Sequence, residues 1–368
     1  MGKTIDEIAE QLNASNKKVQ LIYAFNGTGK TRLSQAFKNL VQLQNSANDD
    51  DVSLTRDKIL YYNAFTEDLF YWDNDLASNQ DYKMKIQPNT FINWAIKEQG
   101  LDQNIISKFQ HCTDDKLTPI FDLDNGQITF SFQRGNQENP KQVKLSKGEE
   151  SNFIWSIFHA LLELVISELS IAESENRSTN EFDDLAYVFI DDPVSSLDEN
   201  HLIEVASNIG MLIKTSKSSM KFIITTHNPL FYNVLHNELS GKCKYRLEKL
   251  EDGSFNLEDQ KNDAPFAYHH FLITEIQQAI ESNNIQRYHF NLFRNLLEKT
   301  TTFLGYKKWG DLLPNEDGAQ EAYEKRMINI LSHSAQSADE APVLNIQEQQ
   351  LLKFMFNKFL ADYKFNKE

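Results

Sequence analysis

The sequence predicts an α/β fold followed by an α-helical C-terminal domain. Short apolar runs bounded by turn residues, typical of buried parallel strands, occur at residues 19–25, 187–190 and 221–225. Segments with helical periodicity alternate with these runs, which is the pattern of a parallel sheet covered by helices. From about residue 265 onward the strand-like runs end and the pattern becomes helical.

The same change of pattern predicts two domains. The first covers residues 1–264, with a mixed helical segment inserted at about 64–140, and the second covers residues 265–368. The chain has 368 residues, of which 40% are hydrophobic, and this is enough for a sizeable core in one large and one smaller domain.

Charge and cysteine content exclude several classes of protein. The formal net charge is −16, whereas a protein that coats DNA along a broad surface is usually basic; a local, shape-specific nucleic-acid site is compatible with this charge. Two cysteines are too few for a disulfide framework or a zinc site, which favours a reducing setting.

The N-terminus lacks the apolar core of a signal peptide. The most apolar stretch, residues 153–171, is interrupted by polar side chains, as in a buried amphipathic helix. We therefore expect a cytoplasmic protein that binds no membrane.

A glycine-rich turn follows the first strand-like run, at Ala24-Phe-Asn-Gly-Thr-Gly-Lys-Thr31. It differs from the phosphate-binding pattern G-x-x-x-x-G-K-[ST] only at Ala24, which takes the place of the first glycine. In such a loop backbone N–H groups face the phosphates, Lys30 reaches the β- and γ-phosphates, and the Thr31 hydroxyl binds Mg²⁺. The next helix points its positive end at the same anion. We assign nucleotide binding to Asn26, Gly27, Thr28, Gly29, Lys30, Thr31 and Arg32.

The apolar run at 187–190 ends in two carboxylates, Asp191 and Asp192. In phosphate-binding ATPases such a strand holds Mg²⁺ with its first carboxylate, and we assign that role to Asp191. We assign the polarisation of the attacking water to Asp192. Many strands end in aspartate, so the assignment gains its specificity from the sequence Pro-Val-Ser-Ser-Leu-Asp that follows, up to Asp198.

Three further segments resemble motifs of the ATP-binding-cassette (ABC) ATPases. Leu-Ser-Lys-Gly-Glu-Glu at 145–150 resembles the signature motif, usually Leu-Ser-Gly-Gly-Gln; residues 195–198 resemble the D-loop; and His227 resembles the switch histidine that contacts the γ-phosphate. All of them occur in the ABC order. The resemblance implies an α/β ABC-type ATPase head in which His227 takes part in nucleotide hydrolysis. It adds further nucleotide contacts at Ser146, Lys147, Gly148, Glu149 and Asp198.

The ABC resemblance also implies an assembly. In that family the signature motif of one subunit docks on the γ-phosphate bound to another, so at least a head-to-head dimer is expected, with Mg²⁺ and ATP or GTP as cofactors. The stretch between the phosphate-binding loop and the signature is too short for the long coiled coil of SMC proteins. Asn63, just past a strand-like piece at 59–62, is our candidate for the position of the family's Q-loop glutamine.

The helical C-terminal region carries a charged pair. Arg294 and Glu298 are four residues apart and share one helix face, a spacing that a surface ion pair worth about 0.3 kcal/mol also satisfies. Aromatic residues interleaved with arginine and histidine between residues 265 and 310, such as Tyr288 and Trp309, suit stacking on unpaired RNA bases. For any one of these aromatics, a place in the core is the better explanation.

Over nearly its whole length the chain resembles the PrrC family of bacterial anticodon nucleases. The residues that carry this resemblance are 19–31, 59–75, 145–155, 187–202 and 294–298. The block at 59–75 is not a general ABC feature and therefore favours this family in particular. The resemblance implies a motor head that controls a C-terminal RNase, which cuts a lysine tRNA on the 5′ side of the wobble base. It also implies that a type I DNA restriction–modification complex keeps the nuclease silent until a phage disables that complex.

The family's catalytic set is an arginine and a glutamate four apart on a helix, with a histidine several turns later. Carried onto this sequence, the set is Arg294, Glu298 and His333, and Asp263 is the candidate for anticodon recognition. Attack by a ribose 2′-OH needs a base, an acid and a cation, so no metal is expected at the RNase centre. Glu298 and His333 would be base and acid, in this order or reversed, and the products would be a 2′,3′-cyclic phosphate and a 5′-OH end.

Two other functions stay open at this point. An ABC-type defence sensor could lack a nuclease centre and pass its signal to a separate effector, and the acidic net charge favours this alternative. An ATPase for DNA-end processing is disfavoured because there is no room for a coiled coil. The set of Arg294, Glu298 and His333 favours the nuclease.

Overall fold

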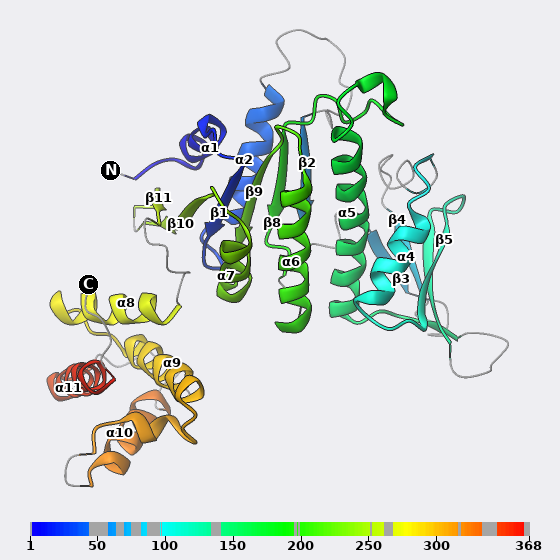
Figure 1. Cartoon of the computed structure of the whole chain (residues 1–368). Helices are drawn as coiled ribbons and strands as arrows, with labels where there is room; N and C mark the ends of the chain where they lie inside the picture. The colour runs from blue at the N-terminus through cyan, green and yellow to red at the C-terminus, as the bar shows by residue number, and fades with distance from the viewer. Residues whose placement is uncertain are drawn as a thin grey trace. The chain divides into compact units, whose positions relative to one another are not determined.

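The computed structural model describes residues 2–43, 58–63, 70–74, 82–86, 96, 98–133, 141–194, 197, 199–250, 252–260, 268–315, 318–332 and 344–363. The chain consists of two compact units, Met1–Phe266 and Ala267–Glu368 (Figure 1). The boundary expected from the sequence, between residues 264 and 265, lies close to this division.

A six-stranded sheet forms the centre of the first unit. Its strand order is β11–β10–β1–β9–β8–β2, and every neighbouring pair is parallel except β10 and β11. The strands are β1 (Val19–Tyr23), β2 (Ile59–Asn63), β8 (Tyr187–Asp191), β9 (Lys221–Thr226), β10 (Cys243–Lys249) and β11 (Phe255–Asp259). All of β1 is buried, and β8 and β9 are buried after their first residue, as is usual for strands covered on both faces. The three predicted strands, which are β1, β8 and β9, are confirmed.

Helices cover both faces of this sheet (Figure 1). On one face lie α1 (Ile5–Ala14) and α2 (Lys30–Leu43), and on the other lie α5 (Lys147–Leu169), α6 (Glu199–Thr215) and α7 (Pro229–Glu238). Side chains of β9 alternate between the two sides, because successive residues of a strand point to opposite faces. Ile223 packs with α1 and α2, whereas Phe222 and Ile224 pack with α5, α6 and α7.

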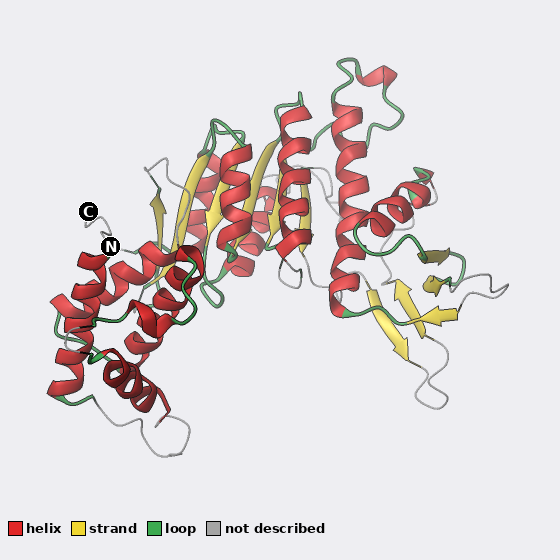
Figure 2. Cartoon of the chain, turned by 60° about the horizontal axis from the view of Figure 1, so that its bottom comes forward, coloured by secondary structure: helices red, strands yellow, loops and turns green. Residues whose placement is uncertain are grey.

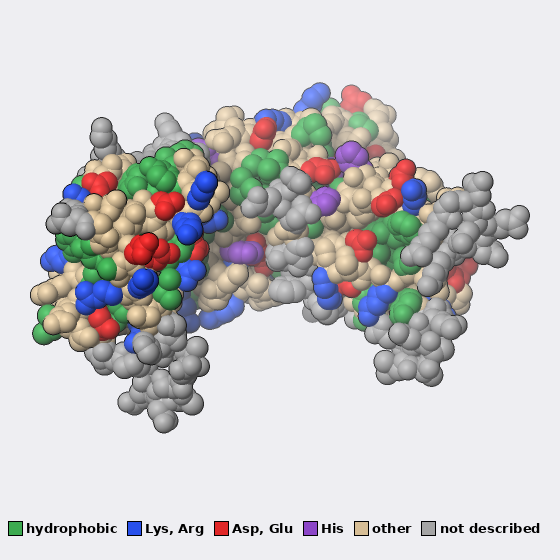
Figure 3. Space-filling model, turned by 90° about the horizontal axis from the view of Figure 1, so that it is seen from below, with side chains coloured by type: hydrophobic (Ala, Val, Ile, Leu, Met, Phe, Trp, Pro, Cys, Tyr) green, Lys and Arg blue, Asp and Glu red, His purple; other side chains and the backbone are tan. Residues whose placement is uncertain are grey.

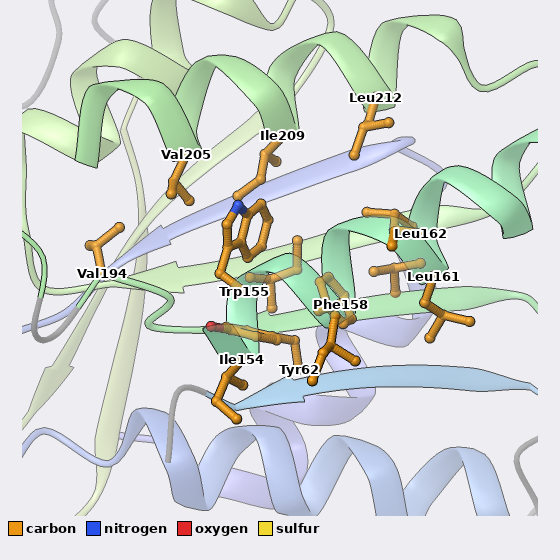
Figure 4. Close-up of a cluster of buried hydrophobic side chains, with 14 of the residues drawn as sticks. Tyr62, Ile154, Trp155, Phe158, Leu161, Leu162, Val194, Val205, Ile209 and Leu212 are labelled. Carbon is orange, nitrogen blue, oxygen red and sulfur yellow. The ribbon is translucent and has the colours of Figure 1, made fainter. Parts of the chain in front are cut away.

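The central core helix is α5. Trp155 and Phe158 of α5 pack against Tyr62 of β2 at ring-centroid distances of 5.5 and 4.6 Å, and α6 adds Ile209 to the same cluster (Figure 4). Among the described residues α5 is the one helix long and apolar enough to cross a membrane, but 78% of its apolar window is buried inside the protein. The interpretation of residues 153–171 as a buried helix is therefore confirmed.

A second, five-stranded antiparallel sheet has four of its strands within residues 64–140, the segment expected to be a helical or mixed insertion, and its fifth, β7, directly after them. Its strand order is β3–β4–β6–β5, and β7 pairs with β6. Its elements are β3 (Phe70–Asn74), β4 (Tyr82–Ile86), α4 (Asp102–His111), β5 (Leu117–Asp122), β6 (Gln127–Phe132) and β7 (Lys141–Val143). Phe109 of α4 and Phe130 of β6 pack on Phe153 of α5 at 5.4 and 5.0 Å, which fixes this sheet to the core helix. Among the described residues of the insertion, more lie in strands than in helix α4.

The second unit is helical, and its described residues contain no strand (Figure 2). Its elements are α8 (Tyr268–Glu281), α9 (Arg287–Leu304), the 3₁₀ helix η4 (Trp309–Leu312), α10 (Gln320–Ser332) and α11 (Ile346–Asp362). Phe293 of α9 packs on Phe356 and Phe359 of α11, both at 5.8 Å. Helix α9 ends at Gly305, whose φ of 76° closes the helix in the left-handed conformation that glycine adopts easily. After this turn η4 packs back on α9.

Candidate nucleotide site and nuclease centre

The glycine-rich turn lies between β1 and α2. Gly27 and Gly29 have φ values of +80° and +110°, which side-chain-bearing residues rarely adopt. Ala24 precedes the turn, and its N–H donates to the carbonyl oxygen of Thr226 at 2.9 Å, so it continues the pairing of β1 with β9. Its φ is not positive, which explains why alanine replaces the motif's first glycine without strain. Because α2 begins at Lys30, the unbonded N–H groups of its first turn are available to an anion at this loop.

The ammonium group of Lys30 lies inside this loop. Its Nζ donates to the carbonyl oxygens of Ala24 and Phe25 at 3.2 and 3.3 Å, and to Asn26 Oδ1 at 3.2 Å. It also forms an ion pair with Asp192 Oδ2 at 3.3 Å, and the residue is only 7% exposed. The loop and the end of β8 therefore hold a buried cation between them, as binding of phosphate oxygens requires.

Asp191 closes β8 and is buried. Its carboxylate accepts hydrogen bonds from Thr225 Oγ1 at 2.6 Å and from Ser34 Oγ at 3.3 Å. Burial raises the pKa of Asp191, and hydrogen bonds from Thr225, Thr31 and Ser34 oppose this rise. Thr31 and Asp191 thus meet although they come from α2 and β8. A hydroxyl beside a carboxylate is the kind of oxygen donor set that Mg²⁺ prefers, so these two residues fit the ion.

Asp192 links the lysine to the predicted switch histidine. It has a φ of +48°, in the left-handed region where aspartate is among the more frequent non-glycine residues. His227 Nδ1 lies 2.6 Å from Asp192 Oδ2, and the backbone N–H of His227 donates to Oδ1 at 3.3 Å. Burial by itself would raise the pKa of Asp192, but the hydrogen bond from His227 and the charge of Lys30 outweigh it and the pKa is lowered. One hydrogen-bonded group therefore unites three predicted site residues, Lys30, Asp192 and His227.

The predicted signature segment forms the N-terminus of α5. Ser146 is the N-cap: its Oγ accepts from the N–H of Glu149 at 3.3 Å, and Glu149 Oε2 accepts from the N–H of Ser146 at 2.6 Å. Glu150, only 2% exposed, accepts from Lys147 Nζ at 2.8 Å and from Trp72 Nε1 at 2.7 Å. The four predicted signature residues therefore lie at one helix N-terminus, which is a favourable place for an anion.

The predicted nuclease pair lies on an exposed face of α9. Arg294 Nε donates to Glu298 Oε1 at 2.8 Å, and the two side chains are 43% and 47% exposed. The Arg294 guanidinium also lies over the ring of Trp309 in η4, 5.6 Å from its centroid. Two contacts from different elements thus fix the direction of one exposed cation. Helix α10 packs on both α9 and η4, and it ends at Ser332, the residue before His333.

Three predicted site residues lie outside the described residues: Asp198, Asp263 and His333. The side chain of Asn63 is outside them as well, although its backbone pairs in register with that of Asp191. On the face of the molecule shown in Figure 3, Lys and Arg side chains are interspersed with Asp and Glu. This face offers no broad basic field, which agrees with the net charge of −16 and leaves a local nucleic-acid site as the arrangement to consider.

Comparison with known proteins identifies the family to which the chain belongs. A family described as an AAA domain matches residues 113–360. An Escherichia coli protein named anticodon nuclease is 51% identical over 383 residues, which cover 97% of this chain and 96% of that protein. The chain belongs to the anticodon nuclease family. The resemblance based on residues 59–75 and the other quoted segments is therefore confirmed, as is an α/β ATPase head with a helical C-terminal part.

Two solved structures share a weak likeness with this anticodon nuclease family member. An SMC head bound to the C-winged helix domain of ScpA aligns with a TM-score of 0.33 and 11% identity, covering 67% of this chain and 90% of that one. An SMC head domain from Thermotoga maritima aligns with a TM-score of 0.30 and 12% identity, covering 67% and 92%. At these TM-scores neither likeness bears on the function.

Sequence reasoning missed two contacts, one in the nucleotide site and one at the signature segment. Thr225 binds Asp191, and its position two residues before His227 was the available signal. Trp72 binds Glu150 across 78 residues of sequence, and the signal was its place in the family-specific block at 59–75. Local sequence patterns do not predict the contact between Trp72 and Glu150 itself, because it depends on how the second sheet packs on α5.

Proposed function

We propose that this chain is an anticodon nuclease whose RNA cleavage is controlled by nucleotide hydrolysis in its head. The observation that carries the proposal is the exposed pair Arg294 and Glu298, joined at 2.8 Å on α9 in a chain of the anticodon nuclease family. The family resemblance points to lysine tRNA as the substrate, cut in its anticodon loop on the 5′ side of the wobble base. Asp263 contributes to recognition of that loop.

The cleavage chemistry needs a base, an acid and a cation. Glu298 takes the proton of the ribose 2′-OH, and His333 gives a proton to the leaving 5′-oxygen; these two roles can be exchanged. The 2′-oxygen forms a bond to phosphorus as the bond to the 5′-oxygen breaks, which yields a 2′,3′-cyclic phosphate and a 5′-OH end without a metal at this centre. Because Glu298 binds Nε, both Nη groups of Arg294 can donate to the phosphate in fork geometry.

Nucleotide hydrolysis uses the residues around the phosphate-binding loop. The N–H groups of the loop and Lys30 bind the phosphates of ATP or GTP. Mg²⁺, held by Thr31 and Asp191, would neutralise charge on the β- and γ-phosphates. Asp192 forms an ion pair with Lys30 and His227 binds Asp192, so both can act on the phosphate that Lys30 binds.

The working unit of the head is a head-to-head dimer. The N-terminus of α5, with Ser146 and Gly148 in its first turn, contacts the nucleotide of a second copy, and Asp198 completes that contact. Hydrolysis at this shared site then decides when α9 cuts RNA. The protein acts in the cytoplasm, where its tRNA is found, and a type I restriction–modification complex keeps it silent until a phage disables that complex.

One experiment tests the proposal. Purified full-length protein is incubated with total tRNA, Mg²⁺ and ATP or GTP, and the 5′-OH ends are labelled directly with polynucleotide kinase and mapped. We expect cuts in the anticodon loop of lysine tRNA for the wild type and none for Arg294→Ala. Intact anticodon loops with an actively hydrolysing wild type would refute the nuclease and favour a sensor that signals to a separate effector.

A further inference from the structure

A buried carboxylate joins the second sheet to the first turn of α5. Glu150 is 2% exposed, and each of its oxygens accepts one hydrogen bond from a side chain. Oε1 accepts from Trp72 Nε1 of β3 at 2.7 Å, and Oε2 accepts from Lys147 Nζ at 2.8 Å. Burying a carboxyl group without hydrogen-bond partners is strongly unfavourable, so the two donors stabilise Glu150 in its buried position.

Trp72 contacts the chain on both sides of the N-cap Ser146. Besides its bond to Glu150, its ring lies under Lys144 Nζ, which is 5.4 Å from the ring centroid. The ring of Trp72 also packs on Phe130 of β6, with 6.1 Å between the ring centroids. The start of α5 is therefore attached to β3 and β6 as well as to the core.

We propose that Trp72 is a positioning residue for nucleotide hydrolysis, which holds the signature turn in place through Glu150 and Lys147. The inference rests on the proposed function, since it takes that turn to contact the nucleotide of a second copy. Lys147 stands where ABC signatures usually have glycine, so Glu150 controls where this additional cation lies. Without the indole N–H, Oε1 loses its side-chain donor and the turn loses its attachment to β3.

The variant Trp72→Phe tests the proposal in the full-length protein. Phenylalanine keeps a ring against Phe130 but cannot donate to Glu150. We expect the affinity for a fluorescent ATP analogue to stay within about twofold, because Lys30 and its loop are untouched. Turnover of ATP should fall about tenfold, the factor that corresponds to one lost hydrogen bond of about 1.4 kcal/mol. Because Trp72 acts through Glu150, Trp72→Phe combined with Glu150→Gln should lose no more than the more severe single variant.

The matched control is Phe130→Leu, which disturbs the packing of the indole but keeps its N–H. We expect Phe130→Leu to lower the melting temperature while ATP turnover stays within about twofold of the wild type. Wild-type turnover in Trp72→Phe, or equal losses in both variants, would overturn the positioning role. Failure of the proposed function itself is recognised separately, because the wild type would then hydrolyse no ATP or would hydrolyse it as fast as Lys30→Ala does.

Discussion

Replacing Arg294 by alanine distinguishes two interpretations of this residue, as a catalytic cation and as one partner of a surface ion pair. Both interpretations fit the four-residue spacing, and they differ in which measurement responds. As an exposed ion pair, Arg294 and Glu298 contribute about 0.3–0.5 kcal/mol after solvent screening. The contact of the guanidinium with the Trp309 ring adds about 0.5–1 kcal/mol. Arg294→Ala should therefore lower the melting temperature by only a few degrees.

The effect on RNA cleavage should be much larger. A positioned donor that stabilises developing charge on the reacting group typically contributes a factor of about 10²–10³ in kcat. We expect a loss of this size in single-turnover cleavage of a lysine tRNA anticodon stem-loop by Arg294→Ala. Arg294→Lys should recover only a small part of the rate, because lysine keeps the charge but lacks the planar fork that binds Glu298 and phosphate together.

Lys358→Ala is the matched control for Arg294→Ala. Lys358 and Asp362 form an i,i+4 ion pair on α11 at 3.9 Å, with side chains 39% and 45% exposed, close to the exposure of Arg294 and Glu298. The control should melt within about 2 °C of the wild type and cleave RNA at the wild-type rate. A loss of cleavage in Arg294→Ala no larger than that in Lys358→Ala would refute the reasoning.

Four further predictions follow from the described contacts. Gly29→Ala should abolish nucleotide binding measured by fluorescence titration, because alanine is strained at a φ of +110°. Asp192→Ala should slow ATP hydrolysis at least tenfold while the nucleotide dissociation constant changes little; unchanged turnover would remove its proposed role. Trp309→Leu should lower kcat for RNA cleavage about tenfold with little change in KM, because it releases the cation that the ring holds. Burial first and the charge of Lys108 second lower the pKa of His159 to about 4, so the unfolded chain binds more protons below its ordinary pKa of 6.5. The free energy of unfolding in urea should therefore be highest above pH 6.5 and decrease as the pH falls from 6.5 to 4. His159→Gln should make this decrease smaller.

The parts of the fold that the sequence predicts are those specified locally. Strands β1, β8 and β9 are buried on both faces, so they appear as continuous apolar runs. The turn at Gly27 and Gly29 is equally local, because its positive φ values require glycine at those positions. The second sheet is different: β4 and β6 bury only alternate residues, and their pairing joins distant segments. The sequence of the insertion therefore has no clear strand pattern, although strand residues outnumber helical residues in its described part.

In the candidate site, too, the sequence predicts the local contacts but not those that depend on tertiary structure. The spacing of Arg294 and Glu298 predicted their contact, whereas the catalytic role proposed for the pair rests on the resemblance to the anticodon nuclease family. Trp309 reaches Arg294 because α9 ends at Gly305 and η4 folds back, a tertiary event with no periodic signal in the sequence. Lys30, Asp192 and His227 come together because β1, β9 and β8 are neighbours in the sheet. The apolar runs in the sequence predict these strands but not their order.

The central claim is that nucleotide hydrolysis in the head controls RNA cleavage by α9. The most direct test measures ATP or GTP turnover and lysine tRNA cleavage in the same reaction for the wild type, Lys30→Ala and Arg294→Ala. We predict that Arg294→Ala hydrolyses nucleotide at the wild-type rate and leaves tRNA intact, and that Lys30→Ala loses both hydrolysis and the nucleotide response of cleavage. If Lys30→Ala cut tRNA at the wild-type rate with and without nucleotide, the control of the nuclease by the head would be contradicted.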